Sequence, residues 1–400
     1  MIAHQFASAR TRHARAQVLL FLVALQFFYS WAWSSIDVLR PAFRATLNLS
    51  LTQVGSGYSA QVAGALLGAL AVVRFEHLIG RRHTFVLVTL GTGLSLIAGV
   101  LVTSWGAFLV QRFAVGVFGG AVFPLTMGLI AELFASRVRG RLASLIDGTF
   151  FVAVVALGLA SGQVGLGGWK WMLILGGIPP IIFALAAYRL IPEYTTHAAH
   201  EIVPRVRASV SELFTATYRR RTFALSVMMG ANACGHQAFS GWLTTYLYEV
   251  AQFSGPHVGA VVACQFIGSA TGCIGWGLAV DRYGRRAGSV GLLTAGVAVA
   301  AFLMSPTSPV ILGAMAAMFG LAFAAVVSIG PWLAELYPPA MRTAATSMFQ
   351  WGRFISLIIP PLTGSLAAHW GLSAAMGIAV IALSISATIW SRLPETLDRG

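Results

Sequence analysis

About twelve apolar stretches, each nearly long enough to cross a lipid bilayer as a helix, restrict the fold of this chain more than any other feature. A helix needs about 20 apolar residues to cross a hydrocarbon core of about 30 Å. The stretches are residues 17–39, 52–73, 84–103, 106–134, 142–164, 170–190, 222–250, 256–279, 287–305, 308–336, 343–368 and 371–392. Charged residues make up 10% of the sequence, against about 25% in a soluble domain, so most of the surface cannot face water. The sequence therefore predicts an all-α membrane protein with twelve transmembrane helices.

The positive charge of the chain, +14 at pH 7, is concentrated on alternate loops. Arginine clusters lie at residues 10–15, 74–82, 137–141, 189–221 and 282–286, whereas Arg40, Arg44 and Lys170 fall on the opposite side. Because basic residues mark cytoplasmic loops, we expect a multi-pass protein of the plasma membrane, such as a bacterial inner membrane, with both termini in the cytoplasm. The residues before the first helix lack the layout of a cleavable signal, so this helix should stay in the membrane. Topology accounts for the charge, and no nucleic-acid partner is expected.

The chain carries an internal repeat that divides it into halves of similar length. Three groups recur at separations of 202–204 residues: Gly80-Arg81-Arg82 with Gly284-Arg285-Arg286, Glu132 and Arg139 with Glu335 and Arg342, and Pro192-Glu193 with Pro394-Glu395. Three groups at nearly the same separation indicate that the chain consists of two parallel copies of a six-helix unit. We predict a six-helix bundle at 1–190, a cytoplasmic linker at 191–221 and a second six-helix bundle at 222–400.

Four stretches resemble those of the major facilitator superfamily. They are GLAVDRYGRR at 277–286, RFAVGVFGGAVFP at 112–124, LPET at 393–396 and WGRFISLIIPPLTGSL at 351–366. The paired E-x6-R loops and the LPET ending resemble the sugar porters, and the 351–366 stretch resembles helix 11 of the aromatic-acid:proton symporters. The resemblance implies a twelve-helix transporter, built from two parallel repeats, that works by alternating access.

The resemblance also implies a cytoplasmic latch of charged residues that holds one state of the transporter and breaks in the other. Its expected members are Asp281, Arg282, Arg285, Arg286, Glu335 and Arg342 in the second half, and Glu132, Arg139 and Arg81 in the first. The first half departs from the family pattern, because His77 stands where the acid belongs and Glu76 comes one position early. Either Glu76 or His77 is expected to substitute for it. The alternative interpretation is that these charges only solvate the interface.

Three charged residues lie well inside the apolar stretches, away from the membrane interface, where a charge costs about 2.5–3.5 kcal/mol and is therefore a functional candidate. They are Arg112, Asp147 and Arg353. When the E-x6-R loops are aligned, Asp147 and Arg353 fall at positions where sugar porters contact their substrate, and Gln350 is a further candidate beside Arg353. A guanidinium in the middle of the membrane suits bidentate capture of a carboxylate. The alternative is that Asp147 and Arg353 pair with each other in a structural bridge.

Proton coupling requires a carboxylate whose surroundings change during the transport cycle. In the resembled symporters, an aspartate of helix 1 partners the arginine of helix 4, and that arginine corresponds to Arg112 here. The expected region of helix 1 has no acid, but Asp37 lies one to two turns further out. Asp37 or Asp147 is therefore expected to carry the proton. The alternative for Asp37 is an exposed charge at the end of a helix.

The stretch at 222–250 supplies further candidates for substrate contact. His236 and Gln237 fall where the resembled sugar porters have a polar glutamine pair, and Asn232 lies one turn earlier. We expect these three residues and Trp33 to contact the substrate. The alternatives are that His236 bonds a neighbouring helix and that Trp33 packs in the core or anchors the interface.

No catalytic, metal-binding or nucleotide-binding motif is found in the sequence. H-E-x-x-H, G-x-S-x-G and C-x-x-C are absent, and Trp171 follows Lys170, which excludes a Walker loop. We therefore expect no enzyme activity, cofactor or metal. The predicted function is proton-coupled symport of a small polar metabolite, either an organic or aromatic carboxylate or a sugar-like compound, by a monomer in the lipid bilayer. A drug:proton antiporter and a non-transporting sensor are the alternatives.

Overall fold

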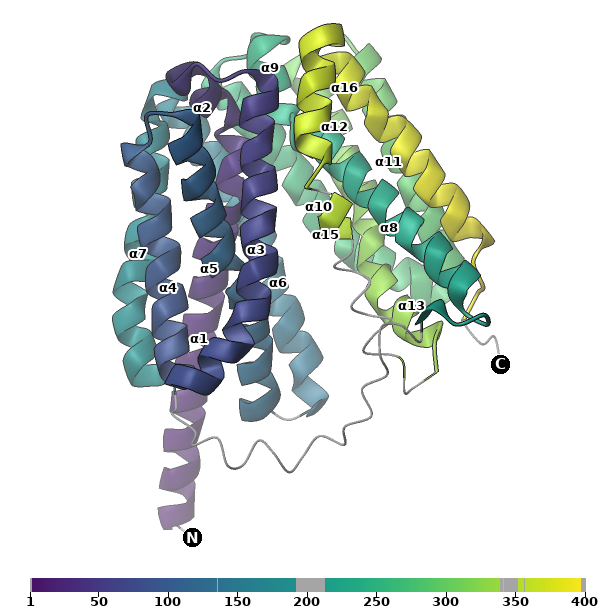
Figure 1. Ribbon diagram of the computed structural model, residues 1–400. Coiled ribbons are helices and arrows are strands. Elements are labelled where there is room, and N and C mark those ends of the chain that lie inside the picture. The colour runs from purple at the N-terminus through teal and green to yellow at the C-terminus, as the bar shows by residue number, and fades with distance from the viewer. Residues whose placement is uncertain are drawn as a thin grey trace. The chain divides into compact units, whose positions relative to one another are not determined.

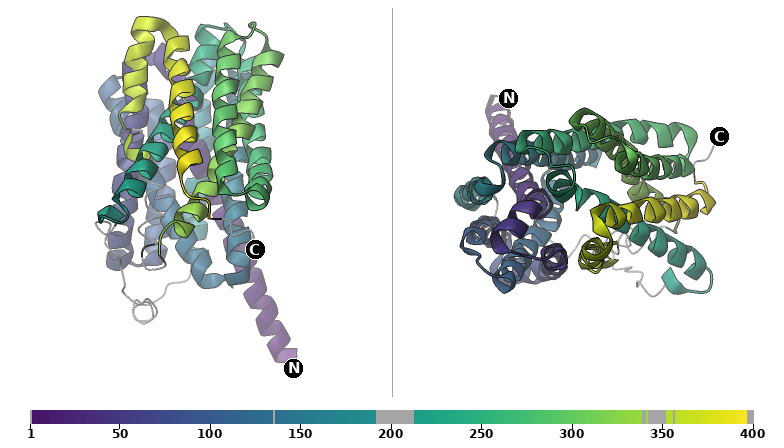
Figure 2. Two further views of the ribbon diagram at one scale, coloured as in Figure 1. Left: turned by 90° about the vertical axis from the view of Figure 1, so that its right-hand side faces the viewer. Right: turned by 90° about the horizontal axis from the view of Figure 1, so that it is seen from above.

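The computed structural model describes residues 2–134, 136–191, 213–338, 341, 352–355 and 357–396. Within these ranges every regular element is a helix, and in Figures 1 and 2 the long helices of each half run side by side. The first half forms α1 (Ile2–Val38), α2 (Arg40–Leu47), α3 (Leu51–Ile79), α4 (Arg81–Ala98), α5 (Trp105–Leu133), α6 (Ser136–Val164) and α7 (Trp169–Leu190). The second half forms α8 (Arg219–Ser240), α9 (Leu243–Glu249), α10 (Gly255–Tyr283), α11 (Gly288–Met304), α12 (Pro309–Phe323), α13 (Ile329–Glu335), α15 (Gly352–Ile355) and α16 (Ile359–Arg392).

Ten helical segments of the described chain are long and apolar enough to cross a membrane, and the predicted all-α membrane architecture is confirmed. Two of the twelve predicted stretches are not among the ten. One contains α8, whose polar residues Asn232, His236 and Gln237 lower its hydropathy. The other, 343–368, lies partly outside the described residues, and its end forms the start of α16. The backbone of α16 bends at Gly371, where a φ of 86° separates this part from the twelfth stretch.

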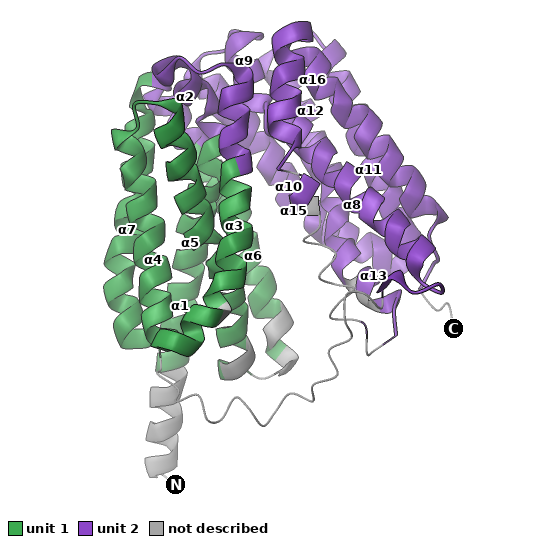
Figure 3. Cartoon of the chain, in the orientation of Figure 1, with its two compact units in different colours: residues 1–36, 60–157, 167–203 green, residues 37–59, 158–166, 204–400 purple. Residues whose placement is uncertain are grey.

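The chain forms two compact units (Figure 3). Unit 1 contains residues 1–36, 60–157 and 167–203, and unit 2 contains residues 37–59, 158–166 and 204–400. The units therefore differ from the two halves of the sequence repeat, because two segments of the first half pack with the helices of the second. Contacts within unit 2 consequently join residues that lie far apart in the sequence.

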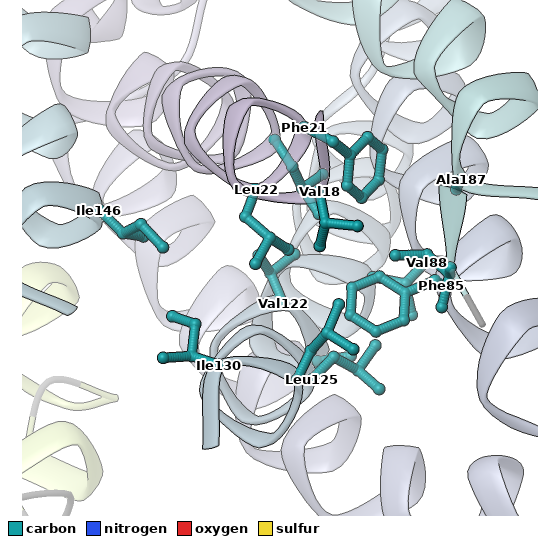
Figure 4. Close-up of a cluster of buried hydrophobic side chains, with 14 of the residues drawn as sticks. Val18, Phe21, Leu22, Phe85, Val88, Val122, Leu125, Ile130, Ile146 and Ala187 are labelled. Atoms are coloured by element: carbon teal, nitrogen blue, oxygen red, sulfur yellow. The ribbon is translucent and has the colours of Figure 1, made fainter. Parts of the chain in front are cut away.

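The core of unit 1 is apolar and is built by several helices around α5 (Figure 4). Leu22 of α1, Phe85 of α4 and Leu125 of α5 are among its members, and Ala187 adds the end of α7. Phe21 and Phe85 meet edge to face with their ring centroids 6.4 Å apart. These contacts fix the helices that carry the charged residues of this unit.

Glycines allow two pairs of helices to pack with their backbones in contact. Gly64 and Gly68 of α3 face the backbone of α5 in unit 1, and a Cβ atom at either position would overlap it. Gly268 and Gly272 of α10 face the backbone of α12 in unit 2 in the same way. The two glycine pairs are 204 positions apart, the separation already seen for the repeated Gly-Arg-Arg sequence. The same close helix packing, which is typical of membrane proteins, is thus present in both halves.

We expect Gly116→Ala to destabilise the protein and Gly128→Ala, in the same helix, to be tolerated. A Cβ atom at Gly116 would overlap the backbone of Gln61 in α3, whereas nothing lies within 4 Å of a Cβ atom at Gly128. Overpacking of a close contact costs about 1–3 kcal/mol. Thermal unfolding of the purified protein in detergent should therefore show a clearly lower midpoint for Gly116→Ala. Equal midpoints for the two variants would contradict the close approach of α3 and α5.

Candidate functional site

Arg112, about two turns from the start of α5, is fully buried in unit 1. Its Nη1 donates a hydrogen bond to Ser35 Oγ of α1 at 2.8 Å, and its guanidinium carbon lies 5.7 Å from the centroid of the Phe108 ring. Trp33, two residues before Ser35, accepts a hydrogen bond at its carbonyl from Gln61 Nε2 of α3 at 2.9 Å. Arg112 therefore contacts α1 through the hydroxyl of Ser35, and the expected role of Asp37 as its partner stays a prediction. The sequence analysis did not identify Ser35.

Asp147 lies on α6 in an apolar span, and its side chain is exposed. Within the described part of the chain it has no ion-pair or hydrogen-bond partner. Arg353, the expected alternative partner, is located in α15, but its side chain is outside the described residues, as is the whole of Gln350. A carboxylate in an apolar span raises the free energy of the protein and usually has a function there. Asp147 therefore stays a candidate for binding a substrate or a proton.

Asp37 forms the centre of a polar cluster in unit 2. Its Oδ1 accepts hydrogen bonds from Arg40 Nη2 at 2.5 Å and from Gln237 Nε2 of α8 at 3.1 Å. The hydroxyl of Thr244, in α9, donates to the backbone carbonyl of Asp37 at 2.6 Å. Two predicted site residues, Asp37 and Gln237, are thus brought together. Arg40 and Thr244 were missed, although the spacing of Asp37 and Arg40 is one that places oppositely charged side chains together on a helix.

Arg40, which the sequence analysis placed among the loop charges, is fully buried. Its guanidinium carbon lies 4.4 Å from the centroid of the Trp242 ring, and Trp242 Nε1 donates to Thr363 Oγ1 of α16 at 2.9 Å. Arg40 Nε and Nη1 have no hydrogen-bond partner among the described residues, so Asp37 and the Trp242 ring provide the observed compensation of its charge. Burial lowers the pKa of Arg40, and the neighbouring Asp37 opposes this effect. An arginine remains charged under these conditions.

His236 lies on α8 at one end of a row of aromatic rings in unit 2. Its ring centroid is 4.9 Å from that of Phe323 in α12, and Phe323 stacks on Phe319 at 5.5 Å with an interplanar angle of 15°. Phe319 is buried, whereas His236 and Phe323 are each partly exposed. Asn232, one turn before His236, is 7% exposed, and its Nδ2 has no partner among the described residues. His236 and Asn232 of α8 therefore lie one turn apart, and the Phe323 ring of α12 packs beside that of His236.

The latch predicted in the second half is centred on Arg285. Its Nη1 donates to Asp281 Oδ1 at 2.8 Å, and its Nη2 donates to Glu335 Oε1 at 2.7 Å. Glu395, from the LPET ending, accepts the backbone N–H groups of Arg285 and Arg286 at 2.8 and 3.0 Å. The hydrogen bonds from Arg285 hold the pKa of the Glu335 carboxyl below its ordinary value of 4.5.

Other predicted members of the latch contact a backbone carbonyl, an aromatic ring or a neighbouring arginine. Arg286 Nε donates to the Leu393 carbonyl at 2.7 Å, and the Arg282 guanidinium lies 5.6 Å from the Tyr283 ring. In the first half, Glu76 pairs with Arg81 Nε at 2.5 Å, and its substitution for the missing acid of the latch stays a prediction. Arg342 and the side chains of Glu132 and Arg139 lie outside the described residues.

A model described as the Major Facilitator Superfamily matches residues 22–257 and 243–399, which together cover nearly the whole chain. The chain belongs to the Major Facilitator Superfamily. The resemblance carried by the sequence motifs is thereby confirmed.

Members of this superfamily with similar sequences are transporters. A protein of Cupriavidus pinatubonensis named "Probable 4-methylmuconolactone transporter" is 24% identical over 383 residues, covering 92% of this chain and 89% of its own. The 4-hydroxybenzoate transporter PcaK of Pseudomonas putida is 23% identical over 380 residues, covering 86% and 84%. The crystal structure of a D-xylose-proton symporter shares the fold with a TM-score of 0.73 at 16% identity, covering 95% of this chain and 98% of that one. The chain is therefore a membrane transporter of the superfamily, and the prediction that it is not an enzyme is confirmed.

We expect Glu335→Gln to lower the thermal stability of the protein at neutral pH, because it removes the charge that pairs with Arg285. A carboxyl whose pKa is lowered in the folded state contributes stability at neutral pH and loses it as the pH falls through that lowered pKa. The Glu335 side chain is 34% exposed, so the shift in unfolding midpoint should be small.

The measurement is thermal unfolding of the wild-type protein and Glu335→Gln from neutral pH into the acid range. The difference between the two midpoints should be largest near pH 7 and vanish toward acid. A difference independent of pH would show that the charge of Glu335 is not the source of the stabilisation.

Proposed function

We propose that this transporter carries small organic carboxylates, aromatic acids above all, into the cell together with protons. The observation that carries the proposal is the exposed Asp147 carboxylate in the apolar span of α6, which has no described partner. A group in this position is able to take up and release a proton as its surroundings change. The named relatives support the substrate class, since one of them transports 4-hydroxybenzoate, an aromatic carboxylate.

In this proposal the charged residues have different roles. Asp147 takes the proton, because Asp37 is already bonded to Arg40 and Gln237. Arg353, with Gln350 beside it, binds the substrate carboxylate, for which a guanidinium is suited. Arg112 is held by Ser35 and couples the movement of α5 to that of α1.

The aromatic rings of unit 2 support an aromatic substrate over a sugar. His236 and Phe323 offer the partly exposed end of a ring stack, and a substrate ring is able to extend it. The Nδ2 of Asn232, one turn away on the same helix, has no partner among the described residues and is a candidate donor for a substrate oxygen. Alternating access between two parallel repeats then moves the bound substrate across the membrane.

The first test follows the internal pH of proteoliposomes while 4-hydroxybenzoate, D-xylose or a cationic drug is added outside. We expect 4-hydroxybenzoate to acidify the interior faster than in protein-free liposomes, which report passive entry of the neutral acid. Asp147→Asn should abolish this excess, whereas Gly128→Ala should preserve it. Alkalinisation by the drug would instead favour the antiporter.

The second test concerns substrate selection by Phe323. Phe323→Leu keeps an apolar side chain but removes the ring that packs against His236, so the KM for 4-hydroxybenzoate should rise about 2–10-fold. The KM for an aliphatic carboxylate of similar size should change little. Phe223→Leu, at a position on α8 that is 68% exposed, is the matched control and should leave both values unchanged. An equal effect of Phe323→Leu on both substrates would contradict ring stacking.

A further inference from the structure

An exposed cluster of one aromatic and two basic side chains joins the ends of α4 and α7, which are neighbours in unit 1 (Figures 1 and 3). The ring of His83, on α4, meets the ring of Tyr188, on α7, edge to face with their centroids 6.1 Å apart. His83 Nδ1 lies 3.0 Å from the Ile79 carbonyl oxygen, which fixes the ring beside Tyr188. Arg189 follows Tyr188 and is also exposed. We name His83, Tyr188 and Arg189 the α4–α7 cluster.

The α4–α7 cluster lies at the end of two lipid-facing helix surfaces. α7 exposes an apolar stripe with a spacing of three or four residues, formed by Leu175, Ile178, Ile182 and Leu185. Tyr188 continues this stripe at the end of the apolar span, which finishes at Leu190. On α4, the exposed Leu87 follows His83 by one turn, in a span that begins at Arg81. The cluster therefore lies where acyl chains give way to headgroups.

The repeat shows that α4 and α7 are joined by a contact that does not need the cluster. Arg82 Nε donates to the Ile191 carbonyl at 2.9 Å, just after the end of α7. Arg286 Nε makes the same bond to the Leu393 carbonyl at 2.7 Å, just after the end of α16. Both halves therefore tie these two chain segments together with one arginine.

The residues around this arginine differ between the halves. At the separations of the repeat, 202–204 residues, the counterparts of the α4–α7 cluster are Ala287, Trp390 and Ser391. Trp390 is fully buried, and its Nε1 donates to the Arg285 carbonyl at 3.0 Å, whereas Tyr188 is 53% exposed. The first half therefore presents at its surface a phenol, an imidazole and a guanidinium that its counterpart lacks.

The surroundings of the α4–α7 cluster are positively charged. The Arg82 guanidinium lies 5.5 Å from the centroid of the Tyr188 ring, and α4 and α7 contain no acidic residue. Glu76 of α3 is already in an ion pair, and Glu193 lies outside the described residues. Within the described chain, the Tyr188 hydroxyl and the Arg189 guanidinium have no hydrogen-bond or ion-pair partner. An anion at the cluster would therefore meet two cations and unused donors.

We propose that the α4–α7 cluster binds the headgroup of an anionic phospholipid, such as phosphatidylglycerol. The Arg189 guanidinium and the Tyr188 hydroxyl donate hydrogen bonds to the lipid phosphate, and the acyl chains follow the apolar stripe of α7. A zwitterionic headgroup gains less, because it carries a cation of its own into a positively charged place. General anchoring of Tyr188 at the interface would give no preference among headgroups. The proposal does not depend on the substrate of the transporter.

The experiment is native mass spectrometry of the full-length protein in detergent, with equimolar phosphatidylglycerol and phosphatidylcholine of equal chain length. The wild type should retain phosphatidylglycerol in preference to phosphatidylcholine. Arg189→Ser, which introduces the residue of the second half, should lower this preference about fivefold, because it removes one charge at the membrane surface. Arg189→Lys keeps the charge and should retain most of the preference. Tyr188→Phe keeps the ring but loses a donor, and should lower the preference about 2–10-fold.

Lys170→Ser is the matched control, because it removes an exposed basic residue from the opposite end of α7 and should leave the preference unchanged. Equal retention of the two lipids by the wild type would overturn the proposal in favour of general anchoring, and this result stands even if a variant fails to fold. An equal fall for Lys170→Ser and Arg189→Ser would also overturn it, since the preference would then follow the overall charge of the protein.

Discussion

Water is absent from the hydrocarbon core of a membrane, and this constraint determines how the helices of both units are held together. Apolar side chains gain little by leaving lipid for a neighbouring helix, so association depends on close backbone contact and on polar groups that bond between helices. Gln61 donates to the Trp33 carbonyl at 2.9 Å beside the glycines of α3. Gln265, the equivalent residue 204 positions later, donates to Ser240 Oγ at 2.5 Å beside the glycines of α10. The duplicated unit thus kept both means of association.

The same constraint makes each buried charge costly, and the two arginines that are fully buried in the described part of the chain are compensated differently. Arg112 has a hydroxyl and a phenyl ring among its neighbours, whereas Arg40 has a carboxylate and an indole ring. A hydroxyl compensates a guanidinium less completely than a carboxylate does, because it carries only a dipole. Arg40 keeps its carboxylate partner within a single segment, because Asp37 lies three residues before it.

The helices could be predicted from sequence because a bilayer demands long apolar runs, but hydropathy does not distinguish a side chain that faces lipid from one that faces protein. Leu70 is 77% exposed and Leu22 is fully buried, although both lie in apolar spans. The contact of Asp37 with Gln237 joins residues 200 positions apart, and no local pattern specifies it. Arg40 was assigned to a loop because a break at Leu39 ends the apolar run, yet α2 turns its side chain into the unit. Motif spacing located the charges of the latch, while their actual partners depend on tertiary packing.

The two ends of unit 2 differ in how their charges meet the solvent. At the end that carries α13, Arg285 joins Asp281 and Glu335, whose side chains are 70% and 34% exposed. At the other end, Arg40 is fully buried against Trp242. Dissolved salt screens exposed charges with a Debye length of about 10 Å at 0.1 M, and it screens buried charges much less. The ion pairs of Arg285 are therefore more sensitive to ionic strength than the contact of Arg40 with Trp242, because the Asp281 and Glu335 carboxylates face the solvent.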